Sequence, residues 1–337
     1  MSDAIDPTRL RAWLERNVPG YTGAPELHRF EGGQSNPTFR LHSPGGDYVL
    51  RRKPAGTVLP SAHAVDREFR VMRALHKTGF PVAAPLALCE DDAVLGSAFY
   101  VMSMVEGRVL WDQTLPGVPP AERAAMFDSM NQTIAALHAV DWRAAGLEGY
   151  GRPENYLARN IARWTKQYRA SEIDRIEAMD RLIEWLPANQ PARDATAIVH
   201  GDFRMDNLIF HPTEPRVVAV LDWELSTLGD PVSDFAYHVM SWRIAPEIHR
   251  GLAGADLAAL GIPAEADYVA AYFRRLGQTP VEHWDYYIVY GMFRLAAIMQ
   301  GILKRAHEGN AASAQAFEVG ARAAPLAAQA WELARSL

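Results

Sequence analysis

The 337-residue chain has only one cysteine, Cys89, and no surplus of basic residues. A single thiol cannot form an intramolecular disulfide or a cysteine-built metal site, so we interpret Cys89 as a core residue. The formal net charge is −6, from 34 basic and 40 acidic residues. Because duplex nucleic acid and anionic membrane surfaces favour basic proteins, we expect neither as a partner.

The chain also lacks the patterns of a secretory signal and of a membrane span. Its first residues are acidic and lead into Pro7, whereas a signal begins with a basic and then an apolar region. The longest apolar stretch, residues 286–303, is interrupted by Arg294 and Gln300. We therefore expect a cytoplasmic protein that does not cross a membrane. Its oligomeric state is not indicated.

The spacing of apolar residues changes near residue 105, from the alternation typical of strands to the three-to-four spacing typical of helices. Before it, short alternating segments predict strands over residues 38–42, 48–52, 86–90 and 98–104. Helices are expected from Asp6-Pro7 onward and over residues 61–78. After it, apolar residues at three-to-four spacing predict helices over residues 120–140, 154–168, 172–186, 263–276, 281–306 and 311–337. A β-rich island, with strands over residues 197–199, 208–210 and 217–221, interrupts these helices.

The polar residues of this island have the spacing of a phosphoryl-transfer site. Asp202 is followed after four residues by Asn207, and Asp222 comes twenty residues after Asp202 at the end of a strand. In that chemistry one Asp orients or accepts the proton of the attacking hydroxyl, while an Asn and a second Asp hold Mg²⁺ on the phosphates. Taken singly, the same residues are more often turn formers in hairpins. Their combination favours the phosphotransferase interpretation.

Residues that could bind the triphosphate lie in the N-terminal strands. Gly32-Gly33 would let backbone N–H groups approach phosphate oxygens, although Gly-Gly is also common in ordinary hairpins. There is no Walker A sequence and no Gly-x-Gly-x-x-Gly. Strand alternation puts Val49, Arg51 and Lys53 on one face. Solvent-exposed strand charges are the simpler alternative for the two cations.

His200-Gly-Asp-x4-Asn207, followed by Leu-Asp222-Trp-Glu and by Gly-Asp230-Pro, resembles the aminoglycoside phosphotransferase and choline kinase superfamily. The resemblance implies an α+β, bilobal protein-kinase-like fold, with a small antiparallel-sheet lobe carrying one helix at residues 1–105 and a larger, mainly helical lobe at residues 106–337. It implies Asp202 as the catalytic aspartate and Asn207 and Asp222 as Mg²⁺ ligands. It also implies that His200 braces the loop and that Asp206 faces solvent. Asp230 and Asp234 would support loops, with a substrate contact as the alternative. Glu224 is left open between a second metal or substrate contact and solvation.

The same resemblance assigns the ATP site. Gln34-Ser35, with Gly32 and Gly33, is similar to the nucleotide loop of the family. Arg51 stands where antibiotic kinases have a lysine and would pair with Glu68, with Lys53 as a rival. Residues 99–106 resemble the interlobe hinge, whose backbone from Ser103 to Val105 would hydrogen-bond adenine. The pattern does not distinguish ATP from GTP.

Four segments, residues 32–39, 48–54, 61–69 and 164–168, look most like the phosphotransferase domain fused to acyl-CoA dehydrogenases in animals. That branch implies a small-molecule hydroxyl acceptor such as a hydroxy acid or hydroxyacyl thioester, whereas the superfamily label implies aminoglycosides. The helices after residue 229 offer acidic and basic residues to the acceptor side in similar number, so charge does not decide between these acceptors. The acidic ones are Glu247, Asp256, Glu265, Asp267 and Asp285, and the basic ones are Arg243, Arg250, Arg274 and Arg275. Aromatic residues at helical spacing could line an apolar slot but are more often core: Trp164, Tyr168, Trp242, Trp284, Tyr286 and Tyr287.

Two other functions compete with the phosphotransferase interpretation. A pseudoenzyme or scaffold could retain the fold and bind nucleotide without catalysis, but Asp202, Asn207 and Asp222 are all intact. A serine hydrolase could use Ser35, but the Gly-x-Ser-x-Gly elbow lacks its final glycine and its strand-turn-helix context. His138, the base such an enzyme would need, is expected to cap a helix C-terminus instead.

Overall fold

The structure, a computed structural model, describes residues 6–30, 36–54, 64–192, 195–309 and 315–337. Contacts within the chain divide it into two compact units. The first comprises Met1–Arg108, Asp141–Tyr150 and Leu208–Ser226, and the second comprises Val109–Val140, Gly151–Asn207 and Thr227–Leu337. The chain therefore returns to the first unit twice after its N-terminal segment.

The first unit is built on an antiparallel five-stranded sheet in the order β1-β2-β3-β5-β4. Its strands are β1 (Glu26–Arg29), β2 (Thr38–Ser43), β3 (Gly46–Arg52), β4 (Pro85–Cys89) and β5 (Phe99–Ser103). The last four match the strands predicted from alternation. The edge strand β1 was not predicted, because its four residues are mostly polar and exposed.

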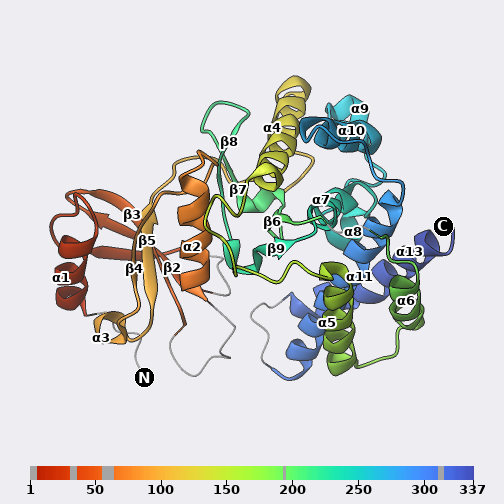
Figure 1. Ribbon diagram of the computed structural model, residues 1–337, viewed down its shortest axis with the longest axis horizontal. Helices are drawn as coiled ribbons and strands as arrows, with labels where there is room; N and C mark the ends of the chain where they lie inside the picture. The colour runs from red at the N-terminus through yellow and green to blue at the C-terminus, as the bar shows by residue number, and fades with distance from the viewer. Residues whose placement is uncertain (1–5, 31–35, 55–63, 193–194, 310–314) are drawn as a thin grey trace. The chain divides into compact units, whose positions relative to one another are not determined.

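Helices lie on both faces of this sheet (Figure 1). On one face, α1 (Pro7–Asn17) and α3 (Asp92–Leu95) cover a core that contains Leu50, Phe99 and Val101. Tyr100 points to the other face, where its ring lies 6.0 Å from Phe69 of α2 (Val65–His76). Side chains along a strand point alternately to the two faces of the sheet. The odd-numbered residues of β3, including Arg51, therefore point to the face that α2 covers.

The hairpin of β7 (Leu208–Phe210) and β8 (Val217–Val220) belongs to the first unit. It is joined to the N-terminal segment by backbone hydrogen bonds, from Val220 N–H to the Pro81 carbonyl at 2.9 Å and from Arg108 N–H to the Phe210 carbonyl at 2.8 Å. The following 3-10 turn, η2 (Trp223–Leu225), buries the Trp223 indole, which donates to the Val220 carbonyl. Asp222, between β8 and η2, is thereby fixed in position.

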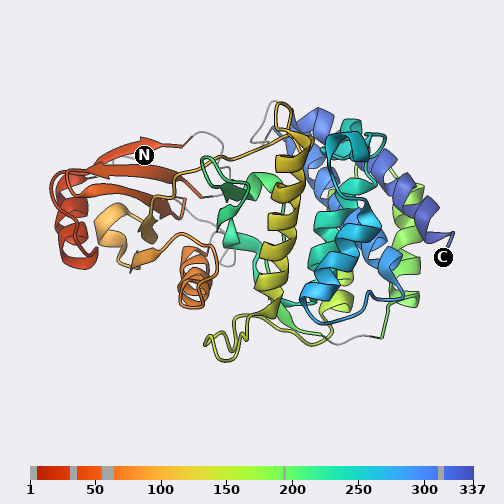
Figure 2. The same cartoon turned by 90° about the horizontal axis from the view of Figure 1, so that it is seen from above.

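The second unit is mainly helical. Its longer helices are α4 (Pro120–Ala139), α5 (Tyr156–Ser171), α6 (Glu177–Ala188), α7 (Pro231–Val239), α10 (Glu265–Arg275), α11 (Trp284–His307) and α13 (Ala323–Ala334). The shorter ones are α8 (Pro246–His249), α9 (Leu257–Leu260) and α12 (Ala316–Ala321). α11 packs against α5, α7, α12 and α13 (Figure 2). The six predicted helices are present with shifted ends, except that the last is divided into α12 and α13.

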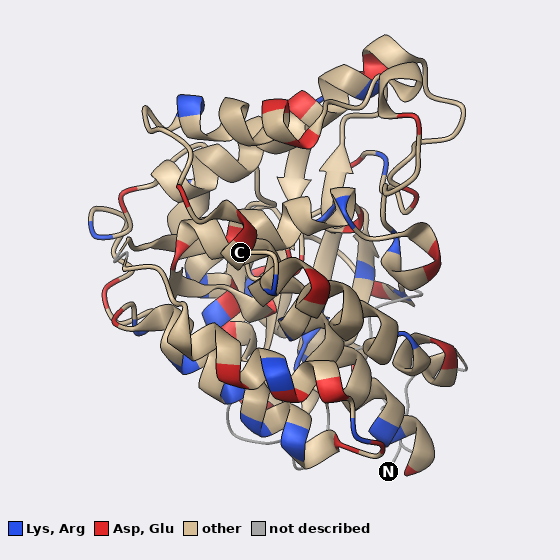
Figure 3. Ribbon diagram, turned by 90° about the vertical axis from the view of Figure 1, so that its right-hand side faces the viewer, with Lys and Arg blue, Asp and Glu red and all other residues tan. Residues whose placement is uncertain are grey.

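One described helix, α11, is long and apolar enough to cross a membrane by length and composition alone. Most of its apolar window is buried inside the protein, as in the core helix of a globular fold. Acidic and basic residues are interspersed on the helices of the second unit (Figure 3).

A two-stranded sheet in the second unit leads directly to the candidate site. Here β6 (Ala197–Val199) pairs antiparallel with β9 (Thr227–Gly229), and the β6 residues are fully buried. The chain leaves β6 into a loop that closes in the 3-10 turn η1 (Met205–Asn207). Because β6 is held in the core, the loop that follows it has a rigid base.

Candidate functional site

The loop after β6 brings two of the predicted site residues together. Asn207 donates its side-chain amide to the Asp202 backbone carbonyl at 2.9 Å and to Asp202 Oδ2 at 3.2 Å. Gly201 makes the turn into this loop with a φ of 83°, a left-handed conformation that favours glycine. His200 is fully buried, and its Nδ1 accepts from the Asp202 N–H at 3.2 Å. His200 therefore braces the loop, as the sequence predicted.

Asp234 of α7 holds the backbone of the same loop. Its carboxylate accepts from the His200 and Gly201 N–H groups, both at 2.8 Å, and lies 3.2 Å from His138 Nε2. Burial alone would raise the pKa of Asp234, but the hydrogen bond and charge of His138 hold it below its ordinary value. The cap predicted for His138 is wrong, because its other ring nitrogen bonds to the Tyr272 hydroxyl at 2.7 Å inside the core.

Arg294 is a loop support that the sequence analysis did not identify. It is buried in α11, donates to the Gly201 carbonyl, and has its guanidinium 4.2 Å from the centre of the Tyr237 ring. Burial lowers the pKa of Arg294, but nearby tyrosines and Asp202 outweigh this effect and keep it above the ordinary value. A lone arginine inside an apolar helix was the available signal, since such a charge needs a specific partner.

The prediction that Asp206 faces solvent is wrong. Its side chain is only 6% exposed, and two arginines contact it. Arg250 Nη1 donates to Asp206 Oδ2 at 2.6 Å, and Arg204 Nε lies 3.4 Å from Oδ1. Arg204 Nε also lies 3.2 Å from Asp202 Oδ2. A chain of alternating charges thus runs from Asp202 to Arg250.

In the first unit, Arg51 of β3 is the centre of a second cluster. Its Nε lies 2.8 Å from Oε2 of Glu68, on α2, and its Nη2 lies 3.0 Å from Oδ1 of Asp222. Glu224 Oε2 is 3.6 Å from the same nitrogen. The ion pair expected between Arg51 and Glu68 is present. Asp222 adopts a φ of 62°, which is strained for a residue other than glycine and recurs at functional sites.

Glu68 is held by more than one donor. Besides Arg51, its carboxylate accepts from the Asn36 amide at 2.8 Å and the Tyr100 hydroxyl at 2.9 Å. Burial raises the pKa of Glu68 to about 7, and the charge of Arg51 opposes that rise. For Arg51, burial lowers the pKa but the charge of Glu68 outweighs it. Arg51 is therefore a permanent cation at a fixed position on the sheet.

The other residues expected to bind nucleotide lie outside the described residues or make contacts within the sheet. Gly32, Gly33, Gln34 and Ser35 lie outside the described residues. Val49 is buried in β3, and Lys53 follows the end of that strand. The N–H and hydroxyl of Ser103 both bond to the backbone of Ala84, each at 2.9 Å. Val105, half-buried, comes after the strand.

Several residues considered for the acceptor side have structural partners. Arg243 pairs with both Glu265 and Asp285 at 2.6 Å. Asp256 caps α9 by accepting from the Ala259 N–H at 3.0 Å. Five of the six aromatic candidates are buried in the core: Trp164, Tyr168, Trp242, Tyr286 and Tyr287. The sixth, Trp284, donates its indole N–H to Glu265 at 2.9 Å.

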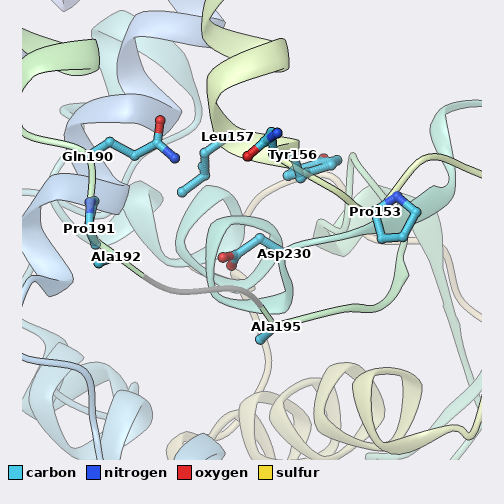
Figure 4. A pocket seen from close by; sticks show the side chains of 9 residues that line it. Pro153, Tyr156, Leu157, Gln190, Pro191, Ala192, Ala195 and Asp230 are labelled. Atoms are coloured by element: carbon cyan, nitrogen blue, oxygen red, sulfur yellow. The ribbon is translucent and has the colours of Figure 1, made fainter.

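A pocket of about 340 Å³ lies elsewhere in the second unit. Figure 4 shows Asp230, Gln190 and Tyr156 around it. Asp230 is the N-cap of α7, since its carboxylate accepts from the Ser233 N–H at 2.9 Å. Asp230 therefore stabilises the start of α7, and a contact with substrate stays a prediction.

Comparison with known proteins identifies the family. The sequence pattern that defines the phosphotransferase enzyme family matches residues 26–285, and the chain belongs to this family. The chain is 46% identical over 315 residues to acyl-CoA dehydrogenase family member 10 of Mus musculus; the match covers 93% of this chain but only 30% of the mouse protein.

Solved structures agree with this assignment. A protein from Ralstonia eutropha JMP134, provisionally assigned as an aminoglycoside phosphotransferase, is 54% identical with a TM-score of 0.92 over 99% of both chains. A thermostable mutant of aminoglycoside phosphotransferase APH(4)-Ia, in ternary complex with AMP-PNP and hygromycin B, is 18% identical with a TM-score of 0.61 over 97% of this chain and 98% of its own. The second likeness shows the fold alone. The resemblance and the α+β kinase-like fold predicted from the sequence are confirmed.

Proposed function

We propose that the protein transfers the γ-phosphoryl group of ATP to a hydroxyl of a small molecule, with Mg²⁺ and in the cytoplasm. Membership of the phosphotransferase family supports the class of reaction. ATP as donor is supported by the AMP-PNP held by APH(4)-Ia. The observation that favours it most directly is the ion pair of Arg51 with Glu68, next to Asp222. Kinases use a strand cation braced by a helical glutamate, and a metal-binding Asp, in the same way.

On the nucleotide side, we assign Arg51 to the phosphates. Glu68 holds the Nε of its guanidinium, and phosphate oxygens would contact the Nη atoms, of which Nη2 also contacts Asp222. The Gly32-Gly33 loop, with Gln34 and Ser35, would add backbone donors. Because the Ser103 N–H is committed to Ala84, we place the adenine contact on Val105 rather than on the Ser103 amide.

The residues assigned to Mg²⁺ fit its preferences. Asn207 uses its side-chain nitrogen for Asp202, so its side-chain oxygen would be offered to the metal, and the Asp222 carboxylate would be the second ligand. The described residues contain no group of three or more His, Cys, Asp or Glu side chains placed to hold a metal ion. Mg²⁺ needs only one or two carboxylates, because phosphate oxygens and water complete its shell. When bound, it neutralises charge on the phosphates.

Asp202 is assigned to the acceptor hydroxyl. Arg204 and Asn207 both contact its Oδ2, so Oδ1 is the oxygen that would meet the hydroxyl. The acceptor oxygen forms a bond to the γ-phosphorus as the bond to the β–γ bridging oxygen breaks, and ADP leaves. The hydroxyl proton passes to Asp202. Asp234 and Arg294 hold the loop in the geometry that this transfer requires.

Binding of Mg-ATP tests the nucleotide assignment. Arg51→Gln should weaken Mg-ATP binding by about tenfold or more, because a charge-assisted contact to phosphate is lost. Arg40→Gln is the matched control, since Arg40 lies on the neighbouring strand and pairs with Asp47 at the exposed surface. Isothermal titration calorimetry measures both affinities.

Because Arg51→Gln leaves Glu68 buried without its cation, thermal unfolding must first show that the variant is folded. Arg51→Lys keeps the charge and should bind Mg-ATP within a few-fold of the wild type. Equal affinity of the folded Arg51→Gln protein and the wild type would contradict the assignment.

A further inference from the structure

We propose that Arg250 binds an anionic group, a carboxylate or a phosphate, on the acceptor, so that the acceptor is an anionic hydroxy compound and not a polycationic antibiotic. This inference rests on the proposed function and names the acceptor class for the same site. It follows from the residues that surround Asp202 within the second unit. Arg250 would be a specificity-determining residue, and Asp206 would hold it in place.

The first support is that the carboxylates next to the reaction are already neutralised. Asp202 has Arg204 at 3.2 Å, and Asp206 has both Arg204 at 3.4 Å and Arg250 at 2.6 Å. A polycation such as an aminoglycoside needs carboxylates that are not paired within the protein. Here each of the two nearest carboxylates faces an arginine, which favours a ligand of opposite sign.

The second support is that Arg250 is accessible while its partner is not. The Arg250 side chain is 40% exposed, whereas that of Asp206 is 6% exposed. Asp206 takes Nη1, so Nε and Nη2 are the atoms that the guanidinium offers to a ligand. Arg250 also lies 5.2 Å from the ring centre of Trp111, which is 58% exposed. An exposed tryptophan beside an arginine gives a surface for the apolar part of an anionic molecule.

The third support is that the backbone holds Arg250 in a strained position. Its φ of 43° is left-handed, which is strained for a residue with a Cβ. The next residues fix it: Gly251 packs so closely on the Ile244 carbonyl that a side chain there would clash, and the Leu252 N–H donates to the Ser241 carbonyl at 2.7 Å. The loop therefore fixes the backbone from which Arg250 projects, and the ion pair with Asp206 holds its guanidinium.

The fourth support concerns the carboxylates that could have attracted a cation. Of the five acidic residues expected on the acceptor side, Glu265 and Asp285 are paired with Arg243, and Asp256 caps a helix. The two others, Glu247 and Asp267, are at the exposed surface. The described part of the second unit thus uses most of these carboxylates structurally, while Arg250 remains accessible.

Phosphorylation of matched acceptors tests the inference. The purified protein is incubated with Mg-ATP and with 3-hydroxybutyrate or glycerol 3-phosphate, each beside its neutral counterpart, 3-hydroxybutyramide or glycerol, and with kanamycin. Phosphate gain is followed by mass spectrometry. We expect kcat/KM for an anionic member to exceed that of its neutral counterpart by about 10- to 100-fold. The carboxylate and phosphate pairs distinguish the two anions.

Variants then locate the preference. Arg250→Gln should bring the ratio of anionic to neutral kcat/KM close to one, mainly by raising KM for the anion, and Arg250→Lys should restore part of it. Arg274→Gln is the matched control, because Arg274 is exposed on α10. It should leave the ratio unchanged. Thermal unfolding and Mg-ATP binding of each variant show that the fold is intact.

Three results would overturn the inference: preference for kanamycin or a neutral acceptor, an unchanged ratio in folded Arg250→Gln, or Mg-ATP binding with phosphorylation of neither anionic compound. The last result leaves the proposed function standing. Failure to bind Mg-ATP at all contradicts the proposed function itself.

Discussion

At the scale of single residues, the loop that carries Asp202 is held by side chains that lie both near it and far from it in the sequence. The spacing of Asp202 and Asn207 predicted that they share a loop, and the structure joins them by two hydrogen bonds. Asp206, between them, was misplaced, because its arginine partner lies 44 residues further along the chain. Arg294 was missed for the same reason. Contacts between residues so far apart in the sequence depend on the fold, and the pattern of neighbouring residues does not predict them.

A buried histidine gives a residue-scale prediction on pH. His238 is 4% exposed, and its Nε2 lies 2.9 Å from the Tyr268 hydroxyl. Burial lowers the pKa of His238 to about 4, although Asp234 and the Phe203 backbone oppose the shift. The unfolded chain takes up this proton near pH 6.5 and the folded chain near pH 4. Stability is therefore fully present above pH 6.5 and falls as pH decreases from 6.5 to 4, by about 3 kcal/mol for this residue.

Urea unfolding at several pH values between 4 and 7.5 measures this dependence. His238→Gln should be less stable than the wild type at pH 7 but should lose less stability toward pH 4. His249, whose pKa burial also lowers to about 4, contributes in the same direction. Glu68, whose pKa burial raises to about 7, contributes in the opposite direction over the same range, so the slope that remains in His238→Gln is the sum of these two effects. Asp234, held below its ordinary pKa, affects stability only at lower pH. A slope that His238→Gln leaves unchanged would refute the assignment.

At the scale of elements, long periodic segments were predicted well and short or fully buried ones were not. β9 has three residues, too few for an alternating pattern. All nine residues of α7 are buried, so α7 has no polar face to reveal its period. Its Asp230-Pro231 start repeats the Asp6-Pro7 pattern that did predict α1. The division between α12 and α13 follows from Pro325, which has no N–H to donate to the Ala321 carbonyl.

The cap of α7 can be tested at this scale. Asp230→Ala removes the acceptor for the Ser233 N–H and should lower the free energy of unfolding by about 1–2 kcal/mol. Because α7 also holds Asp234, the variant should transfer phosphate more slowly. Asp267→Ala, at an exposed position of α10, is the control and should change stability by less than about 0.5 kcal/mol. Equal stability of the two variants in urea unfolding would show that the cap contributes little.

At the scale of the whole molecule, the sequence motifs were sufficient for the family and fold class but not for the acceptor. Family motifs reflect the phosphoryl-transfer chemistry, which many acceptors share. Acceptor choice instead depends on a few side chains such as Arg250, whose partner and exposure are known only after folding. The chain also spans less than a third of the mouse relative, so the activity of that whole protein does not transfer to it.

The most direct test of the central claim is transfer by Asp202→Ala. With Mg-ATP and an acceptor that the wild type phosphorylates, we predict that the rate falls by about 10²- to 10⁴-fold, because the hydroxyl loses the group that orients it and takes its proton. Affinity for Mg-ATP, measured by calorimetry, should stay within a few-fold of the wild type. Undiminished turnover in this variant would contradict the assignment of Asp202 and the mechanism built on it.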